Sequence, residues 1–410
     1  LYYLAGLTGW KYQEVCPPGA WPQLDYDTQP EGLTSEAMDG WRFAKHIGKD
    51  FVYTSGLGWF EFDGVRLRHE REIANSKRVV NKLFNIIINE SRRYNQKVQE
   101  ALRKHASQLE RNSGLNAAIT ASQSHLRIPD DLLDSNPDIL CCKNGILNLV
   151  TGELKPGVIT DFVSKQAHAH YLGLQAPEPP LFVEQMNWLF DDHPEIIQFV
   201  QKWLGYSLSG RVNEHLFPEF IGEGGNGKSK LFEAIMQVFG DYGVVLNAEV
   251  FHDTSSSICR EATMEFMGKR LAYAAETKEK GVLNEQFIKT AVGNDKMVGR
   301  VLYHGLVSFR ATHKLMLVTN FKTIVVGKDH SIWRRLVNIH TTERKLTHDD
   351  KERGEKIKAE ADLILSWLVR GFQRYLKEGL SIPEKLKKEN EAFREEMNLL
   401  KRFINENCYV

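Results

Sequence analysis

The sequence predicts an α/β fold, with helical regions on either side of a core in which strands and helices alternate. An apolar run that ends at Ile221 leads through a glycine-rich loop into a segment of helical periodicity. Further apolar runs follow at 271–275 and 315–318, and apolar residues recur at helical spacing over 181–209 and 346–407. Strands that alternate with helices are typical of parallel sheets covered by helices.

Composition excludes several classes of protein. The 410 residues are 42% hydrophobic and 26% charged, as in ordinary globular proteins, and 53 Lys/Arg balance 53 Asp/Glu. The balanced charge argues against a uniformly basic nucleic-acid coat, so any contact with nucleic acid must come from local patches. No apolar run is long enough to span a membrane, and five scattered cysteines show no metal-ligand spacing. We expect a protein of the cytoplasm, the host's if the source is viral, without membrane contact.

We expect four regions along the chain. A proline-rich break at 173–180 ends a mostly helical N-terminal region with small β elements (1–180). A helical collar (181–212), a nucleotide-binding core (213–345) and a C-terminal helical segment (346–410) follow. Because the chain opens with Leu1 rather than Met, we expect it to be a piece of a longer protein.

The N-terminal region contains one strongly basic stretch. We expect a short strand from Trp59 to an Asp63-Gly64 turn, helices over 65–111, and loops or short helices over 112–136. Residues 65–111 hold 12 Lys/Arg against 5 Glu, which leaves two interpretations open. The cations form a solvated helix face, or they meet a phosphate backbone.

The most specific motif follows the strand expected at 216–221 and precedes a helix expected at 228–239. It has the form G-x-x-x-x-G-K-[ST] and consists of Gly222, Glu223, Gly224, Gly225, Asn226, Gly227, Lys228 and Ser229. Its glycines let successive backbone N–H groups face a phosphate, and the positive end of the next helix adds to the attraction. Lys228 is placed to reach the β and γ phosphates, and Ser229 to bind Mg²⁺. The motif predicts ATP and Mg²⁺ as cofactors.

Two later strand ends carry the remaining polar groups that such a site requires. Glu276 follows the apolar run 271–275 and is the candidate for metal binding and water activation, although Glu279 is close enough to share the role. Asn320 follows the run 315–318, where an amide can sense the γ phosphate or orient water. Arg334 and Arg335 precede another apolar strand, and an arginine supplied across a subunit interface can stabilise a transferred phosphoryl group.

With these motifs in this order, the chain resembles a superfamily-three helicase. More narrowly, it is similar to the helicase part of phage and plasmid primase-helicases related to the poxvirus primase-helicase. The resemblance covers nearly the whole chain. The matching segments are Asn144-Gly-Ile-Leu-Asn-Leu149, Thr151-Gly-Glu-Leu154, Gly268-Lys-Arg-Leu271, Gly293-Asn-Asp295, Trp333-Arg-Arg-Leu336 and Trp367-Leu-Val-Arg-Gly371.

The resemblance implies an AAA+-like ATPase that assembles as a ring, usually a hexamer. ATP would bind between subunits, with Lys228, Ser229, Glu276 and Asn320 from one subunit and Arg335, or failing that Arg334, from its neighbour. It also implies replication of a phage, virus or plasmid, 3′-to-5′ movement, and a primase-polymerase domain earlier in the same full-length chain.

The resemblance further implies a DNA-binding hairpin between the acid strand and the sensor strand. Residues 297–302 would form the first strand of this hairpin and residues 306–310 the second, with the turn near Tyr303 and His304. Lys296, Arg300 and His304 would hold phosphates, and Tyr303 would offer a ring to a base or sugar. An ordinary hairpin with solvated basic residues is the alternative.

The function expected is therefore ATP-driven movement on single-stranded DNA with unwinding of the duplex. Two alternatives stay open: an ATPase that remodels DNA or loads a partner without processive unwinding, and a non-enzymatic scaffold that binds DNA and oligomerises. A small-molecule kinase is disfavoured, because the arginine pair and the basic hairpin would have no role in it.

Overall fold

The computed structural model describes residues 30–70, 76–109, 111–252, 263–275, 281–293, 296–301, 305–326, 330–344 and 352–407. Contacts divide the chain into two compact units. The smaller unit extends to Leu132 and includes Val158–Phe162, and the larger one comprises Leu133–Gly157 and Val163–Val410. This division differs from the boundary expected at 173–180, because most of the segment 133–180 packs with the larger unit.

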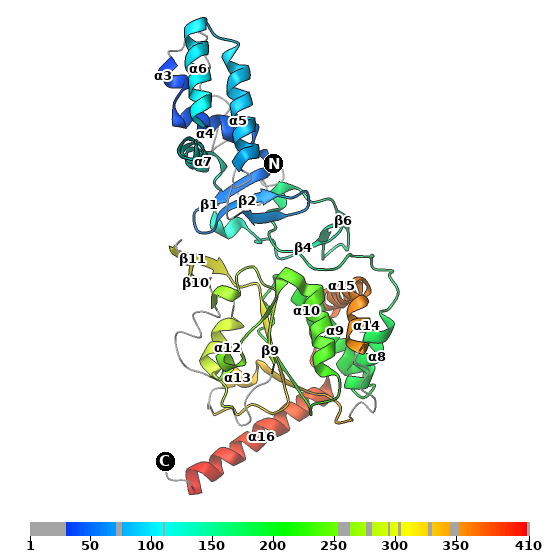
Figure 1. The fold of residues 1–410 in the computed structure, drawn as a ribbon. Coiled ribbons are helices and arrows are strands. Elements are labelled where there is room, and N and C mark those ends of the chain that lie inside the picture. Colours follow the sequence, from blue (N-terminus) through cyan, green and yellow to red (C-terminus); the bar gives the residue numbers. More distant parts are fainter. Residues whose placement is uncertain are drawn as a thin grey trace. The chain divides into compact units, whose positions relative to one another are not determined.

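The smaller unit combines a helical bundle with an antiparallel sheet. The sheet has the order β1-β2-β3, and Figure 1 shows α5 and α6 as a hairpin of helices. The elements are α3 (Pro30–Leu33), α4 (Glu36–His46), β1 (Phe51–Thr54), β2 (Gly58–Phe62), β3 (Leu67–Glu70), α5 (Ser76–Ser91), α6 (Gln96–Leu109) and α7 (Asn112–Leu126). Leu83, Ile87 and Leu102 are fully buried in its core.

Two expectations for this unit were wrong. The polar stretch expected as loop or short helices contains the long helix α7, and the segment expected as helix begins with strand β3. α7 was hard to recognise because its buried face combines one large apolar residue, Leu115, with the small residues Ala118 and Ser122. A Cβ on Gly40 of α4 would lie 2.6 Å from the Cβ of Ala121, so the two helices approach closely through small side chains.

The larger unit is built on a parallel sheet with the order β13-β7-β12-β9-β8. Its strands are β7 (Phe217–Ile221), β8 (Gly243–Val245), β9 (Leu271–Ala275), β12 (Lys314–Thr319) and β13 (Leu336–His340). Numbered along the chain, this order is 5-1-4-3-2, and every neighbouring pair is parallel. The carboxyl ends of all these strands therefore meet at one edge, where ligands of open α/β sheets bind.

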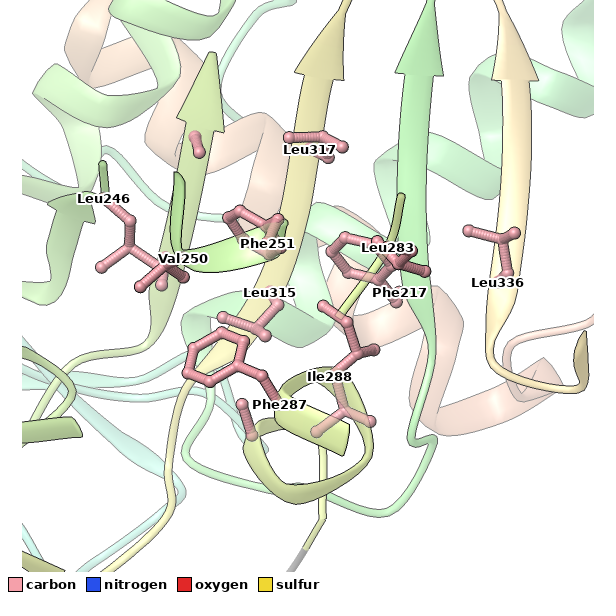
Figure 2. Packing of buried hydrophobic residues seen from close by; sticks show 14 of the residues in the cluster. Phe217, Leu246, Val250, Phe251, Leu283, Phe287, Ile288, Leu315, Leu317 and Leu336 are labelled. Atoms are coloured by element: carbon pink, nitrogen blue, oxygen red, sulfur yellow. The ribbon is translucent and has the colours of Figure 1, made fainter. Parts of the chain in front are cut away.

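Helices cover both faces of this sheet (Figure 1). One face carries α12 (Glu285–Ala291) and α13 (His330–Trp333) over an apolar cluster that includes Phe217, Phe251 and Leu315 (Figure 2). The other face carries α8 (Pro180–Leu189), α9 (Pro194–Leu208), α10 (Lys228–Phe239), α14 (Arg353–Ala359) and α15 (Ala361–Glu378). The α/β class and the strands at the motif, the acid run and the amide run are thus confirmed.

Glycines allow the collar to meet the C-terminal region closely. A Cβ on Gly205 of α9 would lie 2.3 Å from the backbone N of Phe372, and a Cβ on Gly371 of α15 would lie 2.3 Å from the carbonyl oxygen of Gln201. Side chains at either position would force the helices apart. Beyond α15, α16 (Glu384–Asn407) contacts the edge strand β13. Across the described part of the chain, no helix combines the length and apolar character that crossing a bilayer requires.

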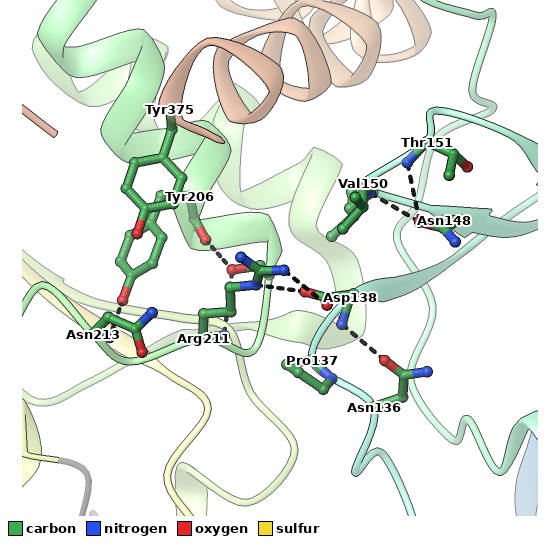
Figure 3. Close-up of polar contacts among 12 residues, drawn as sticks. Asn136, Pro137, Asp138, Asn148, Val150, Thr151, Tyr206, Arg211, Asn213 and Tyr375 are labelled. Atoms are coloured by element: carbon green, nitrogen blue, oxygen red, sulfur yellow. Dashed lines mark hydrogen bonds and ion pairs between the residues drawn. The ribbon is translucent and has the colours of Figure 1, made fainter. Parts of the chain in front are cut away.

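The segment that enters the larger unit is fixed by arginines. Arg211 donates from Nε and Nη2 to the carboxylate of Asp138, at 2.6 and 2.9 Å (Figure 3). The buried Arg270 donates to the carbonyl oxygens of Asn136 and Pro137. A small antiparallel sheet follows, formed by β4 (Ile139–Cys142), β5 (Gly145–Asn148) and β6 (Leu154–Lys155), which pair in that order.

Candidate nucleotide-binding site and nucleic-acid interface

The glycine-rich loop lies at the carboxyl edge of the sheet, between β7 and α10. Gly225 and Gly227 have φ angles of 87° and 85°, a conformation that residues with a Cβ rarely adopt. A Cβ on Gly222 would lie 1.8 Å from Oγ1 of Thr341. The loop therefore needs its glycines both for its curvature and for its contact with the segment after β13.

Asn226 anchors the loop from behind. The side chain is buried, and its Nδ2 donates to Oγ1 of Thr341 at 3.0 Å and to the carbonyl oxygen of Thr342 at 2.9 Å. Its Oδ1 accepts from the backbone N of Lys228 at 3.2 Å. Asn226 thus holds the loop through its side chain, whereas the sequence motif had suggested only a backbone role. No local signal identifies Thr341 and Thr342 as its partners.

Lys228 occupies the centre of the site. Its side chain is buried, and Nζ donates to the carbonyl oxygens of Gly222 at 2.7 Å and Thr319 at 2.5 Å, and to Oδ1 of Asn320 at 3.2 Å. Burial lowers the pKa of this ammonium to about 8. Among the described residues no carboxylate pairs with it, so a charge remains that an anion can neutralise.

The other predicted residues of the loop and of the sensor strand surround this lysine. Ser229 is exposed in the first turn of α10, and Asn320 is exposed directly after β12. A Cβ on Gly224 would lie 3.9 Å from Nδ2 of Asn320, so the amide faces the loop. Glu223, Gly224 and Gly225 are exposed on the outer side of the loop. The structure therefore brings the motif and Asn320 together.

The acid strand reaches the same edge. The last residue of β9, Ala275, pairs with Val318 of β12, and Thr319 pairs with Ile221 of β7. The candidate acids Glu276 and Glu279 lie outside the described residues, so their roles stay predictions.

The arginine pair lies at the other end of the sheet. Leu336, which follows Arg335, pairs with Phe217, four residues before the end of β7. That separation is about 13 Å along the strand at ~3.3 Å per residue. Arg334 is exposed, whereas Arg335 is half-buried and donates from Nη1 to the carbonyl oxygen of Ser331 at 2.7 Å. Both arginines therefore lie near the amino ends of the strands, at the edge of the sheet opposite the one that carries the glycine-rich loop of the same chain.

A buried carboxyl group supports the segment that follows Asn320. Glu219 of β7 is fully buried and accepts from the backbone N and Oγ1 of Thr323, at 3.3 and 3.1 Å. Burial raises the pKa of Glu219 to about 7, although both Thr323 bonds and the charge of Lys322 act in the opposite direction. Sequence reasoning missed this contact, because a glutamate inside an apolar strand gives no indication of its partner.

The expected hairpin exists. Strands β10 (Lys296–Val301) and β11 (Gly305–Arg310) pair antiparallel, with Val301 opposite Gly305. Lys296 and Arg310 face each other across the strands, and both are exposed. Like charges directly opposite are destabilising, and the described residues supply no ion pair for either cation. Tyr303, His304 and the side chain of Arg300 lie outside the described residues.

Comparison with known proteins identifies similar sequences and a similar fold. Residues 41–205 match the family described as D5 N terminal like. The chain is 25% identical over 344 residues to "Putative helicase L207/L206" of Acanthamoeba polyphaga mimivirus, covering 78% of this chain and 35% of that protein. It is 27% identical over 304 residues to "Putative primase C962R" of African swine fever virus (isolate Warthog/Namibia/Wart80/1980), covering 67% of this chain and 31% of that protein. The chain is thus similar to the D5 N-terminal-like family over residues 41–205, and to viral proteins named helicase and primase over two thirds or more of its length.

The chain spans about a third of the length of the curated relatives it matches. Its fold is similar to the apo structure of the NrS-1 C-terminal region, with a TM-score of 0.54 at 13% identity. That similarity covers 86% of this chain and 74% of the other. The family match covers the upstream region 41–205, and the glycine-rich loop lies downstream of it.

Proposed function

We propose that this D5-like chain is an ATP-driven DNA helicase with an AAA+-like core, acting in viral, phage or plasmid replication. The observation that carries the proposal is the buried Lys228 ammonium, held by carbonyl and amide oxygens at the mouth of a glycine-rich loop. Burial of a cation without a carboxylate is costly, and a triphosphate would offset that cost. The names of the curated relatives and the sheet order support the same proposal.

The residues at the sheet edge fit a magnesium-bound triphosphate. Lys228 would neutralise the β and γ phosphates, and the exposed hydroxyl of Ser229 would bind Mg²⁺, which supplies charge neutralisation. Asn320 is placed beside the loop to contact the γ phosphate or the attacking water. Glu276 would orient and deprotonate that water.

The arginines would complete the site of another copy. Arg334 and Arg335 precede β13 at a point about four strand residues away from the sheet edge that carries the loop. They are therefore poorly placed to contact a nucleotide bound to the same chain. In a head-to-tail assembly the arginine end of one copy meets the loop end of the next, and such contacts close into rings. A hexameric ring, with ATP between subunits, is the assembly we propose.

The β10–β11 hairpin would carry the contact with single-stranded DNA. Lys296 and Arg310 form an unneutralised pair on one side of the hairpin, and a phosphate between them would relieve their repulsion. Met297 and Phe309 pair on the other side and are buried, so the core holds the hairpin in place. We propose 3′-to-5′ movement, and a primase-polymerase domain in the same full-length chain as a partner.

A strand-displacement assay tests this function. We expect ATP-dependent release of the shorter strand from a duplex with a 3′ single-stranded tail, and none with Lys228→Ala. Hydrolysis of ATP that never opens the duplex would favour a DNA-remodelling or loading ATPase instead. Absence of DNA-stimulated hydrolysis would favour a non-enzymatic scaffold.

The lowered pKa of Lys228 predicts proton uptake when ATP binds. A phosphate beside the ammonium favours its charged form and raises its pKa, so the complex holds more protons than the free site above about pH 8. ATP affinity should therefore fall as pH rises through this range. Calorimetry in buffers of different ionisation enthalpy should show uptake near pH ~8.5 and little near pH ~7. Lys228→Arg, which cannot lose its proton, is the matched control, and equal uptake by both proteins would contradict the prediction.

A further inference from the structure

The turn between α5 and α6 in the smaller unit carries a concentration of exposed cations. Arg92 and Arg93 follow the last residue of α5, and Lys97 lies in the first turn of α6. We call these three residues the basic turn. Lys82 on α5 and Lys104 on α6 are exposed as well, so positive charge continues along both helices.

The charge of the basic turn is not neutralised within the described part of the unit. None of the three cations forms an ion pair or a side-chain hydrogen bond there. Two carboxylates lie nearby on the two helices. Glu100 is exposed on α6 and accepts from Nε2 of Gln96 at 3.3 Å. The other is Glu90 of α5. Both of its oxygens are taken by the buried Arg42, whose Nε and Nη2 donate to them at 2.7 and 3.0 Å.

One charge of the basic turn affects the pKa of His46, the last residue of α4. The pKa of His46, at the end of α4, is lowered, first by partial burial and next by the charge of Lys45. Arg42 and Arg93 lower it further, against the opposite effect of Glu90. Burial is the largest cause of this shift, and Arg93 is the residue of the basic turn that contributes to it.

The fold holds these cations on a fixed surface. Leu83 and Ile87 of α5 and Val98 and Leu102 of α6 are buried in the core of the unit, so both helices that flank the turn are anchored. Asn95 ends the turn and accepts from the backbone N of Val98 at 3.1 Å, which caps α6. Lys97 is placed in the first helical turn, where a positive charge opposes the helix dipole. A bound polyanion would compensate that cost.

The chemistry of the turn favours double-stranded DNA over a single strand. Proteins that bind single strands combine cations with aromatic rings on which bases stack. Tyr94 is the aromatic residue of this turn, and it packs against the core of the unit. The exposed groups near it are mostly cations and amides, among them Asn89 and Gln96, and Glu100 lies one helical turn further along α6. Such groups contact phosphates without reading sequence.

We propose that the basic turn binds the phosphate backbone of duplex DNA, as a second contact separate from the β10–β11 hairpin. The binding is electrostatic and independent of sequence, and it does not require ATP hydrolysis. It gives the smaller unit a role in holding the duplex on which the larger unit would act.

The test compares two triple variants of the full chain that lose the same charge. One is Arg92→Gln, Arg93→Gln and Lys97→Gln. The control replaces three exposed cations of the larger unit with glutamine: Lys377, Lys387 and Lys388. Fluorescence anisotropy measures binding to a short blunt duplex and to a single strand of oligo-dT at several salt concentrations.

For each DNA phosphate that the variant no longer neutralises, we expect the affinity for the duplex near 0.1 M salt to fall roughly tenfold. The plot of the logarithm of the binding constant against the logarithm of the salt concentration should become less steep by about 0.9. Oligo-dT binding and hydrolysis without DNA should stay unchanged. Duplex binding equal to that of the control variant would overturn the proposal, and so would an equal decrease in oligo-dT binding. Lys228→Ala should retain duplex binding, so failure of the basic turn and failure of the helicase proposal give different results.

Discussion

Replacing Lys228 with alanine should reduce ATP hydrolysis by at least about 10²–10³-fold, the usual loss when one preorganised charge partner of a transition state is removed. Nζ of Lys228 is fixed by Gly222, Thr319 and Asn320 at the point where the loop opens. Alanine leaves the backbone N–H groups of the loop but removes the charge that would neutralise the phosphates. Steady-state hydrolysis with and without single-stranded DNA measures the effect.

Measuring the stability of the Lys228→Ala protein distinguishes a loss of catalysis from a failure to fold. The buried ammonium carries a desolvation cost, shown by its lowered pKa, so alanine should leave the free energy of unfolding unchanged or higher. Lys230→Ala, two residues further along α10, removes the same charge from a residue that does not bind the oxygens around Lys228. Lys230→Ala should retain hydrolysis. A Lys228→Ala protein with near-normal turnover would contradict the assignment of the loop.

Replacing Arg335 with alanine should reduce turnover by about 10³–10⁵-fold, the range known for arginines that stabilise a transferred phosphoryl group. Nucleotide binding should change far less, because this arginine is placed to act on the developing charge. We therefore expect the loss in kcat, with ATP affinity measured separately by a fluorescent analogue. Arg335→Lys keeps the charge but not the planar donor geometry, and it should recover little activity.

The neighbouring Arg334 provides the control substitution, Arg334→Ala, for the effect of Arg335→Ala on turnover. It is exposed, whereas Arg335 is half-buried and donates to the carbonyl oxygen of Ser331. If Arg334→Ala abolishes turnover while Arg335→Ala retains it, the roles are reversed. If both variants hydrolyse ATP normally, neither arginine completes a nucleotide site.

Much of the core could be predicted from local pattern. The helix expected at 228–239 has those bounds, and the apolar runs 271–275 and 315–318 lie in parallel strands. These elements have strong local signals, because buried parallel strands are continuous apolar runs and glycines mark the phosphate loop. The β10–β11 hairpin, by contrast, was expected from the family resemblance, and the pairing of Lys296 with Arg310 is known only from the structure.

The features that sequence reasoning missed share a physical cause, since they depend on interactions between residues far apart in sequence. α7 packs against α4 where its small residue Ala121 meets Gly40 of α4. Asn226 is fixed by Thr341 and Thr342, more than a hundred residues later. The segment 133–138 joins the larger unit because Arg211 and Arg270 bind it. No periodicity within a single segment encodes such interactions.

The most direct test of the proposed mechanism is to mix two inactive variants, Lys228→Ala and Arg335→Ala. If the arginine comes from a neighbouring copy, an Arg335→Ala chain still has its loop and a Lys228→Ala chain can supply the arginine. In a random one-to-one ring roughly a quarter of the sites would then be complete, and hydrolysis should return on mixing. A mixture that stays as inactive as either variant alone would contradict a nucleotide site shared between copies.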